Sequence, residues 1–272
     1  MIPAEFDYVR AGSLDEAVSL LAEHGEDAKL IAGGHSLLPM MKLRLAFPTV
    51  LIDIRRVADA SYVRVEGDEV AIGALTRHAD LVSSDVLAAE APLIAAVASH
   101  VGDPQVRHRG TIGGSVAHAD PAADLPTAIL ASDATLVLQG PGGRREVPAT
   151  EFFLGYFESV LSPDELIVEL RLPRTGTGAW GYEKFVRRAN DWAIVGVATV
   201  AGRVALTNMA SKPVRATATE EALASGASIA DAAALAAEGT SPVEDMHANA
   251  DYRRHLARVL TRRALEAAAG RS

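Results

Sequence analysis

The sequence predicts an α+β protein built from two domains, and three observations lead to this prediction. The chain has 272 residues, which suits two domains, or one domain with a smaller appendage. Strand patterns and helix patterns alternate along most of the chain, and the last part becomes helical after two strands. The segment Thr175-Gly176-Thr177-Gly178 is the best linker candidate. We therefore expect one domain over residues 1–174 and a second over residues 179–272.

The chain opens with an α/β unit. Ser13-Leu14-Asp15-Glu16 is a capping-box pattern, in which the Ser13 hydroxyl accepts from a free amide and Glu16 reaches back. Apolar residues follow at helical spacing until Gly25 ends the helix. A short strand, Ala28–Ile31, then leads into Gly33-Gly34, and a second strand is expected over Thr49–Ile54.

Hairpins and helices are predicted for the middle of the chain, because turn residues separate short apolar runs of both periods. The expected elements are a hairpin of Tyr62–Val65 and Val70–Ile72, a helix capped by Thr76 and running through Ser83, a helix from Pro92 to about Val101, a buried helix over Ala122–Leu130, a hairpin of Thr135–Gln139 and Arg144–Val147, and a strand over Leu166–Leu172.

The C-terminal part is predicted to begin with two strands and to continue as helices. The strands are expected over Trp180–Val186 and Ala193–Val200. Ala222–Ala237 is rich in alanine but periodic enough to be a packed helix of small residues. The last helix, Tyr252–Ala268, places its leucines and valine along one face and its arginines elsewhere.

Composition excludes several classes of function. The formal net charge of −9 argues against binding to nucleic acid or to an anionic membrane. Because the chain has no cysteine, it cannot ligate an iron–sulfur cluster through thiolates or use a thiol nucleophile. The first residues are acidic and broken by Pro3, unlike a signal peptide, and no apolar run reaches the ~18–20 residues of a membrane span. We expect a cytoplasmic protein that would reach a membrane only through partners.

A paired-glycine loop, Ala32–Ser36, is the first candidate binding element. Two glycines after a strand allow successive backbone amides to face a ligand, and such amides form an anion-binding nest. Ser36 adds a hydroxyl. A phosphate or diphosphate is the natural guest, although a plain strand-to-helix turn is the more common use of one such pair.

A second paired-glycine loop, Thr111–Ser115, repeats the chemistry of the first. Its glycines are flanked by the hydroxyls of Thr111 and Ser115, so the two loops could hold one diphosphate from two sides. Neither loop has the G-x-G-x-x-G spacing of a Rossmann fingerprint. A dinucleotide, if bound, is therefore held by another fold.

Other polar residues lie close to the second loop in sequence. Asp124 could accept hydrogen bonds from ribose hydroxyls, or it could serve only as a helix N-terminal charge. His35 and His118 flank the glycine loops, and they are the histidines expected to contact a ligand. No histidine pair has convincing metal spacing with a third ligand.

These motifs, in this order, resemble the medium, FAD-binding subunit of the carbon monoxide dehydrogenase/xanthine dehydrogenase (molybdenum hydroxylase) family. Each motif alone is weak, but their order and spacing extend over nearly the whole chain. The matching segments are Ala32–Pro39, Arg109–Ser115, His118–Pro126, Glu183–Arg188, Asp245–His247 and Tyr252–Arg254.

The resemblance implies a vanillyl-alcohol-oxidase-type FAD-binding domain of two α/β subdomains, at about residues 1–57 and 58–174, followed by a C-terminal medium-subunit domain of antiparallel sheet and helices. By the same resemblance, both glycine loops bind the FAD diphosphate, and Asp124 matches a ribose-contacting acid. Ile167 and Lys184 match positions near the flavin, where a cation stabilises the reduced form. The implied cofactor-binding residues are Ala32, Gly33, Gly34, His35, Ser36, Leu37, Thr111, Ile112, Gly113, Gly114, Ser115, His118, Asp124, Ile167 and Lys184, with no catalytic residue and no metal ligand.

The function implied by the resemblance is that of an oxidoreductase flavoprotein subunit. Its FAD passes electrons from the [2Fe–2S] clusters of a small partner subunit to an external acceptor, while a large molybdenum-cofactor subunit oxidises the substrate, in a dimer of heterotrimers. The substrate stays open among carbon monoxide, purines, aldehydes and N-heterocycles, and the acceptor among quinone, NAD and oxygen. The alternatives are a stand-alone FAD-dependent oxidoreductase with its own substrate pocket and a non-catalytic nucleotide-binding module.

The sequence departs from the family pattern in one region. Between Val195 and Pro213 the family usually has a longer stretch with two strands, whereas Val200–Val204 makes an abrupt connection here. This shortening predicts a trimmed hairpin in the C-terminal sheet.

Overall fold

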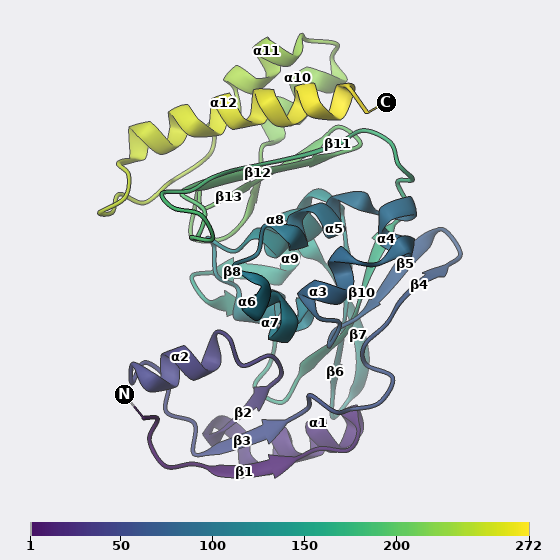
Figure 1. Cartoon of the computed structure of the whole chain (residues 1–272), viewed down its shortest axis with the longest axis vertical. Helices are drawn as coiled ribbons and strands as arrows, with labels where there is room; N and C mark the ends of the chain where they lie inside the picture. The colour runs from purple at the N-terminus through teal and green to yellow at the C-terminus, as the bar shows by residue number, and fades with distance from the viewer. Residues whose placement is uncertain (1, 272) are drawn as a thin grey trace.

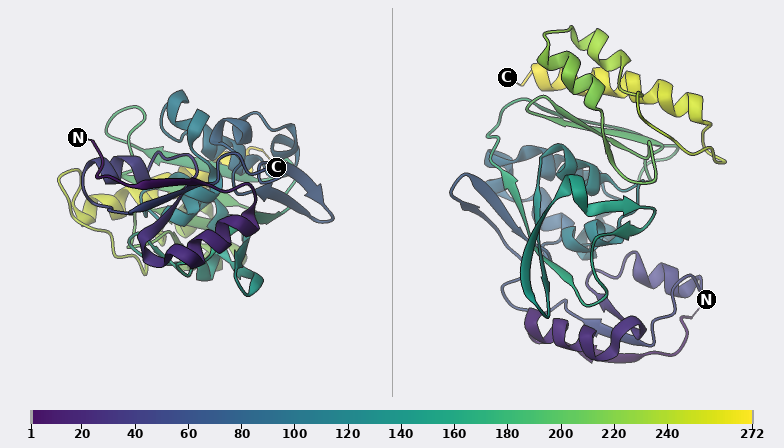
Figure 2. Two further views of the ribbon diagram at one scale, coloured as in Figure 1. Left: turned by 90° about the horizontal axis from the view of Figure 1, so that it is seen from below. Right: turned by 180° about the vertical axis from the view of Figure 1, so that it is seen from behind.

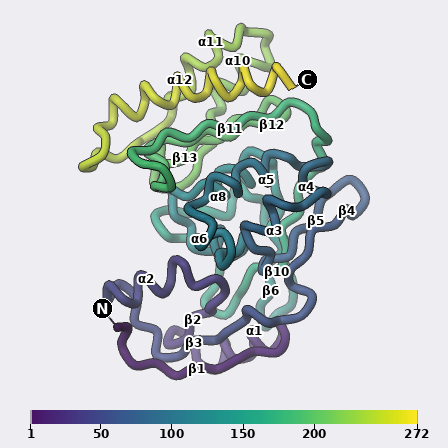
Figure 3. The backbone as a smooth tube through the Cα atoms, in the orientation of Figure 1, coloured from purple at the N-terminus to yellow at the C-terminus, as the bar shows by residue number. Residues whose placement is uncertain are grey.

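The computed structural model describes residues 2–271, which form three parts stacked along the long axis of the molecule (Figure 1). The chain passes through the parts in order, so the N-terminal and C-terminal parts lie at opposite ends (Figure 3). Seen from behind, the middle part again separates the other two (Figure 2). Helices and antiparallel sheets both contribute, which confirms the α+β class.

The N-terminal part is a small parallel sheet of order β1-β3-β2, covered by helix α1. The Ser13 hydroxyl accepts from the amide of Glu16, and the Glu16 carboxylate accepts from the amide of Gly12 at 2.6 Å, so the predicted cap forms. The elements are β1 (Asp7–Arg10), α1 (Leu14–His24), a 3-10 turn (Gly25–Asp27), β2 (Ala28–Ile31), α2 (Leu37–Lys42) and β3 (Val50–Asp53).

The middle part contains a five-stranded antiparallel sheet of order β4-β5-β10-β6-β7. Its strands are β4 (Val63–Glu66), β5 (Glu69–Gly73), β6 (Thr135–Gly140), β7 (Gly143–Pro148) and β10 (Leu166–Pro173). The other elements are α3 (His78–Val82), α4 (Asp85–Glu90), α5 (Pro92–Ser99), α6 (Pro104–Arg109), α7 (Ile112–His118), α8 (Asp124–Ala131), α9 (Ala149–Phe152), and the hairpin of β8 (Phe153–Gly155) and β9 (Glu158–Ser159).

Both faces of this sheet are buried at its central strands, which alternate apolar side chains between two cores. Leu170 and Leu136 face the core formed with helices α3, α5, α7 and α8. Val168 and Val137 face the opposite core, which they share with α1 and the N-terminal sheet. The central sheet thus joins the N-terminal and middle parts.

The prediction that Thr76 caps a helix is wrong. Helix α3 begins at His78, and Arg77 occupies the N-cap position without a side-chain hydrogen bond. The Thr76 hydroxyl instead accepts from the amide of Tyr62 and donates to its carbonyl, both at 3.0 Å. The Thr76 hydroxyl therefore bonds a residue that is distant in sequence, although the local sequence predicted that it would cap the helix.

The C-terminal part is a four-stranded antiparallel sheet of order β11-β12-β13-β14 covered by three helices. Helix α12 lies directly on β11, because Gly181 leaves no space for a side chain: a Cβ there would lie 2.1 Å from the Ala264 carbonyl oxygen. The elements are β11 (Trp180–Phe185), β12 (Val195–Val200), β13 (Arg203–Thr207), β14 (Val214–Arg215), α10 (Thr217–Ala224), α11 (Ile229–Ala234) and α12 (Ala250–Ala269).

The abrupt connection predicted between Val200 and Val204 leaves the hairpin of this sheet intact. Strands β12 and β13 pair in continuous register from Gly196 with Thr207 to Val200 with Arg203. Ala201 and Gly202, both with positive φ, make the two-residue turn that such a hairpin requires. The short connection is a tight turn, and both strands are present.

Candidate cofactor site

A cavity of about 1050 Å³ is lined by residues from all three parts of the molecule. The first glycine loop comes from the N-terminal part, the second from the middle part, and Lys184 from strand β11 of the C-terminal part. Every residue predicted to bind the cofactor lines this cavity except Ile112, whose side chain is buried in the core behind it. The fold thus brings together residues that are more than 150 positions apart in sequence.

The first glycine loop connects β2 to α2 and carries free backbone donors. The structure gives the amides of Gly33, Gly34, His35 and Ser36 no hydrogen-bond partner within residues 2–271. Gly34 has φ +75°, a conformation that suits glycine, and the His35 ring nitrogen Nδ1 lies 3.1 Å from the Gly33 carbonyl oxygen. Successive free amides at a cavity wall are the arrangement that binds an anion.

The second glycine loop begins helix α7, and its amides already have partners. The amide of Ile112 donates to the Thr76 carbonyl, that of Gly113 to the Ala74 carbonyl, and that of Gly114 to the Thr111 hydroxyl at 3.2 Å. The Ser115 amide bonds the Thr111 carbonyl. This loop can therefore offer a ligand the Ser115 hydroxyl, but the expected row of free amides is absent from it.

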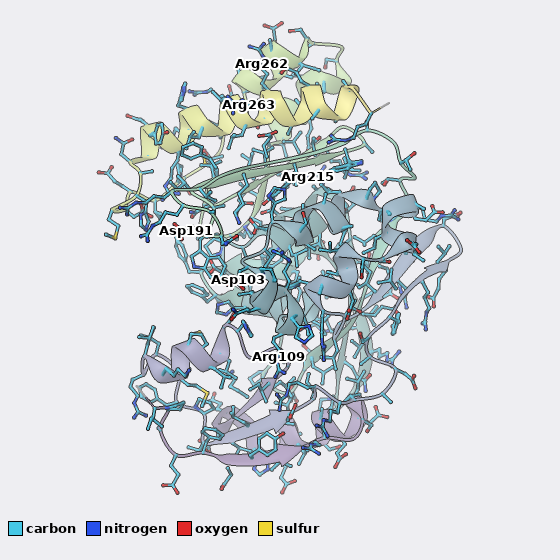
Figure 4. The ribbon with its side chains drawn as sticks, viewed as in Figure 1. Asp103, Arg109, Asp191, Arg215, Arg262 and Arg263 are labelled. Atoms are coloured by element: carbon cyan, nitrogen blue, oxygen red, sulfur yellow. The ribbon has the colours of Figure 1, made fainter. Side chains whose placement is uncertain are left out.

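The first glycine loop contacts, through bare backbone, the residues Arg109 and Gly110 that immediately precede the second loop. A Cβ on Gly33 would lie 2.4 Å from the Arg109 carbonyl oxygen and 2.8 Å from the Gly110 Cα. Figure 4 shows Arg109 where the N-terminal part meets the middle part. Glycine at position 33 is thus required by the close approach of the loops, independently of any ligand.

Asp124 and Lys184 form a buried ion pair that joins the middle and C-terminal parts. Their side chains are 3% and 6% exposed, and Lys184 Nζ donates to Asp124 Oδ2 at 2.8 Å. The Tyr182 hydroxyl donates to the other carboxylate oxygen at 2.7 Å, and Lys184 also donates to the carbonyl of His100. Burial raises the pKa of Asp124, while Lys184 and Tyr182 oppose that shift. Burial also raises the pKa of Tyr182 far above its usual range, so its hydroxyl stays protonated.

Ile167 lies on strand β10 at the cavity wall, where the strand is irregular. The register between β10 and β6 shifts between Ile167 and Glu169. Such bulges recur beside binding sites because they redirect a strand locally. Ile167 is itself buried, and it also lines the cavity.

Two further histidines, besides His35 of the first glycine loop, line the cavity in different surroundings. Burial lowers the pKa of His118, although Asp120 opposes the shift, and its ring contacts that of Phe157 with centroids 5.0 Å apart. His78, which the sequence did not identify, is 4% exposed, and burial lowers its pKa to about 4. Both rings are therefore neutral at neutral pH.

Exposed apolar side chains around the cavity were also missed. The large, exposed members that line it are Leu45, Phe47, Phe157 and Trp192, the last 63% exposed. The available signal was apolar residues in loops, such as Trp192 between Asp191 and Ala193, that match neither strand nor helix period. Such residues at a cavity mouth indicate a surface that a ligand or a partner covers.

Within residues 2–271, no group of three or more His, Asp or Glu side chains is placed to hold a metal ion. No helix in that same range is long and apolar enough to cross a membrane.

Two family models match the chain end to end. Residues 4–175 match the FAD binding domain in molybdopterin dehydrogenase, and residues 180–268 match the CO dehydrogenase flavoprotein C-terminal domain. The cofactor of the chain is therefore FAD, and free amides beside a close glycine contact suit its diphosphate.

Relatives of known identity resemble the chain over its full length. The carbon monoxide dehydrogenase medium chain of Hydrogenophaga pseudoflava is 46% identical, with 98% of each chain covered. The 6-hydroxypseudooxynicotine dehydrogenase complex subunit alpha of Paenarthrobacter nicotinovorans is 40% identical, covering 100% of this chain and 97% of the relative.

The fold matches a solved structure of the same kind. Carbon monoxide dehydrogenase from Hydrogenophaga pseudoflava, lacking the Mo-pyranopterin moiety of the molybdenum cofactor, superposes with a TM-score of 0.95 at 47% identity, covering 100% of this chain and 99% of that one. This match confirms the predicted fold of an FAD-binding domain followed by a domain of antiparallel sheet and helices. The chain belongs to the family of FAD-binding medium subunits of molybdenum hydroxylases, oxidoreductase flavoproteins of the carbon monoxide dehydrogenase/xanthine dehydrogenase type.

Proposed function

We propose that this chain transfers electrons within a molybdenum hydroxylase complex, taking them from [2Fe–2S] clusters of a partner subunit and delivering them to an external acceptor. The observation that carries the proposal is the cavity, which extends from the free amides of the first glycine loop to the buried Lys184 of strand β11. Bound FAD supplies redox chemistry that can hold one or two electrons.

The residues around the cavity support a definite orientation of the cofactor. The free amides of Gly33–Ser36 and the Ser115 hydroxyl would hold the diphosphate, because anions bind where unpaired donors converge. Ile167 and Lys184 would lie near the flavin ring, with Ala32, Leu37 and Thr111 completing the wall. The cavity is at the upper end of the ~300–1,000 Å³ typical of ligand pockets, which suits a dinucleotide.

Asp124 and Lys184 would act together as a positioned charge pair. Both Asp124 oxygens already accept hydrogen bonds from Tyr182 and Lys184, so we assign the carboxylate to holding the lysine in place. Contact with ribose hydroxyls, the role implied by the family resemblance, would use its remaining lone pairs. Lys184 would stabilise negative charge on the cofactor through its fixed ammonium group.

The proposed partners follow from chemistry that this chain lacks. It has no cysteine, so iron–sulfur clusters that reduce its cofactor would have to be held by another chain. Relatives are named as a medium chain or as a subunit of a complex, which supports partners of this kind. We propose a large molybdenum-cofactor subunit and a small [2Fe–2S] subunit, assembled as a dimer of heterotrimers in the cytoplasm.

The decisive experiment isolates the complex from its host and compares it with the same complex lacking this chain. Without this chain, we expect substrate to reduce the iron–sulfur clusters, seen by visible absorbance, but electrons to stop there. Adding back the FAD-loaded chain should restore reduction of the acceptor. A chain that takes up no flavin, or that alone oxidises a small substrate, would contradict the proposal.

A further inference from the structure

His78 has an unexplained feature: one of its ring nitrogens is buried without a partner. Its side chain is 4% exposed, and Nδ1 has no hydrogen-bond partner. Unpaired polar atoms are uncommon in protein interiors because each loses its interaction with water without replacement. A histidine kept in this environment therefore needs a reason beyond packing.

The ring lies directly behind the contact between the first glycine loop and Gly110. The His78 amide donates to the Gly110 carbonyl at 2.9 Å, and a Cβ on Gly110 would lie 2.7 Å from both Cδ2 and Nε2 of the ring. Gly110 in turn contacts Gly33 across the loops. His78 also lines the cavity, so its Nε2 edge borders the place where the loops meet.

The charge state of His78 makes it a neutral donor. Burial, together with nearby His35 and Arg107, lowers its pKa to about 4, so at neutral pH the ring carries a single N–H. Burying an unpaired N–H costs more than burying an unpaired lone pair, since buried donors without a partner are rarer in proteins than buried acceptors without one. The proton therefore belongs on Nε2, the nitrogen that is not fully enclosed, with the bare Nδ1 facing the interior.

The second glycine loop leaves a place for such a donor. Its amides from Ile112 to Ser115 are all bonded within the protein. A diphosphate held by the free amides of the first loop would thus meet few donors on its other side. His78 lines the same cavity with its Nε2 beside Gly110, so it can supply a donor there.

We propose that His78 is a further cofactor-binding residue, whose Nε2–H donates a hydrogen bond to the FAD diphosphate at the junction of the glycine loops. This inference rests on the proposed placement of the diphosphate. It adds a neutral donor that is independent of the loop motifs, in a helix that begins 42 residues after the first loop ends.

Three substitutions test which nitrogen acts. His78→Leu removes the donor, His78→Gln places an amide N–H near the Nε2 position, and His78→Asn places one near Nδ1. FAD is titrated by flavin fluorescence into the flavin-stripped full chain, in the assembly it forms in its host. We expect the Kd for FAD to rise about 10- to 100-fold in the Leu and Asn variants, as for a lost bond to a charged group, and to stay near wild type in the Gln variant.

Thr261→Val is the matched control. Thr261 is also fully buried with an unpartnered hydroxyl, but it lies on α12 away from the cavity, so its Kd should equal that of the wild type. Equal FAD affinity in the Leu variant and the wild type would overturn the role of His78. The role would also be overturned if the Gln variant lost FAD affinity while the Asn variant kept it. If the Leu variant does not fold, the Gln–Asn difference decides. Failure of the wild type to bind FAD would instead overturn the proposed function itself.

Discussion

At the scale of single residues, the site depends on buried polar groups whose partners come from distant parts of the chain. Asp124 is 60 positions from Lys184 and 58 from Tyr182. Each of these side chains would be costly to bury alone, and together they satisfy one another. The pair therefore combines a structural role, joining two parts of the molecule, with a charge at the wall of the cavity.

Removing the lysine should expose this dependence. In Lys184→Met, the buried Asp124 carboxylate keeps only Tyr182, so we expect a loss of about 3–5 kcal/mol of unfolding free energy near neutral pH. Lys184 is one of the groups that oppose the rise in the Asp124 pKa, so that pKa should rise further without it. A carboxyl whose folded pKa is raised loses stability as pH rises through that pKa, so the deficit of the variant should be larger at about pH 8 than at about pH 5. Urea unfolding at both pH values measures it.

The double variant Asp124→Asn/Lys184→Met is the control for that experiment. It removes the uncompensated charge, so most of the lost stability should return and the pH dependence of the deficit should vanish. Wild-type stability of Lys184→Met at both pH values would show that the ion pair contributes nothing to the fold.

His78 should make the stability of the flavin-free protein sensitive to acid. Its folded pKa of about 4 lies below the ordinary 6.5, so its contribution is complete above pH 6.5 and is lost as pH falls toward 4. The shift corresponds to about 3 kcal/mol. In His78→Gln the unfolding free energy, measured by urea titration at several pH values, should fall less over this range. Parallel profiles for the two proteins would contradict this.

At the scale of elements, the close contact between the first glycine loop and Arg109 should be the least tolerant point of the site. In Gly33→Ala the new Cβ would overlap the Arg109 carbonyl, so the loops must separate. We expect a loss of about 1–3 kcal/mol of stability and a clearly higher Kd for FAD. Differential scanning fluorimetry and FAD titration measure the two effects.

Gly142→Ala is the matched control for that substitution. Gly142 lies in the turn between β6 and β7, and a Cβ there would meet nothing within 4 Å. Its stability and FAD affinity should match the wild type. If Gly33→Ala behaved like Gly142→Ala, the first loop would not be in contact with Arg109.

Local elements were predictable from the sequence because their signals are local. The Ser13 cap, the strand before Gly33 and the buried helix containing Asp124 all follow from caps, turns and periodicity. Two errors arose where a distant partner decided. Thr76 bonds Tyr62 instead of capping a helix, and the amides of Ile112 and Gly113 bond carbonyls of the segment before α3.

For the site, the sequence predicted which positions take part but not the contacts between them. The two glycine loops and Lys184 were identified by motif order, and the structure places them around one cavity. The pairing of Asp124 with Lys184 and the burial of His78 were not predictable, since both depend on packing between parts of the chain that are far apart in sequence.

At the scale of the whole molecule, the C-terminal sheet is tied to the middle part. Ala198, Val200 and Ala205 of that sheet belong to the same apolar core as helices α5 and α8. Thr207 donates to Thr127 at 2.7 Å and Arg203 to the Ala131 carbonyl at 2.9 Å across the same boundary. Residues 1–174 and 179–272, which we propose as domains, should therefore not behave independently.

Unfolding should accordingly be a single cooperative transition. Both tryptophans, Trp180 and Trp192, lie in the C-terminal part, so their fluorescence reports that part, whereas far-ultraviolet circular dichroism reports the whole chain. The two probes should give the same urea midpoint. A tryptophan transition at a clearly different midpoint would show that the C-terminal part unfolds separately.

The most direct test of the account is an experimental structure of the FAD-loaded protein. We predict one FAD along the cavity, with its diphosphate at the amides of Gly33–Ser36 and its flavin ring beside Ile167 and Lys184. A flavin bound outside this cavity, or bound within it with the diphosphate at Lys184, would contradict the account.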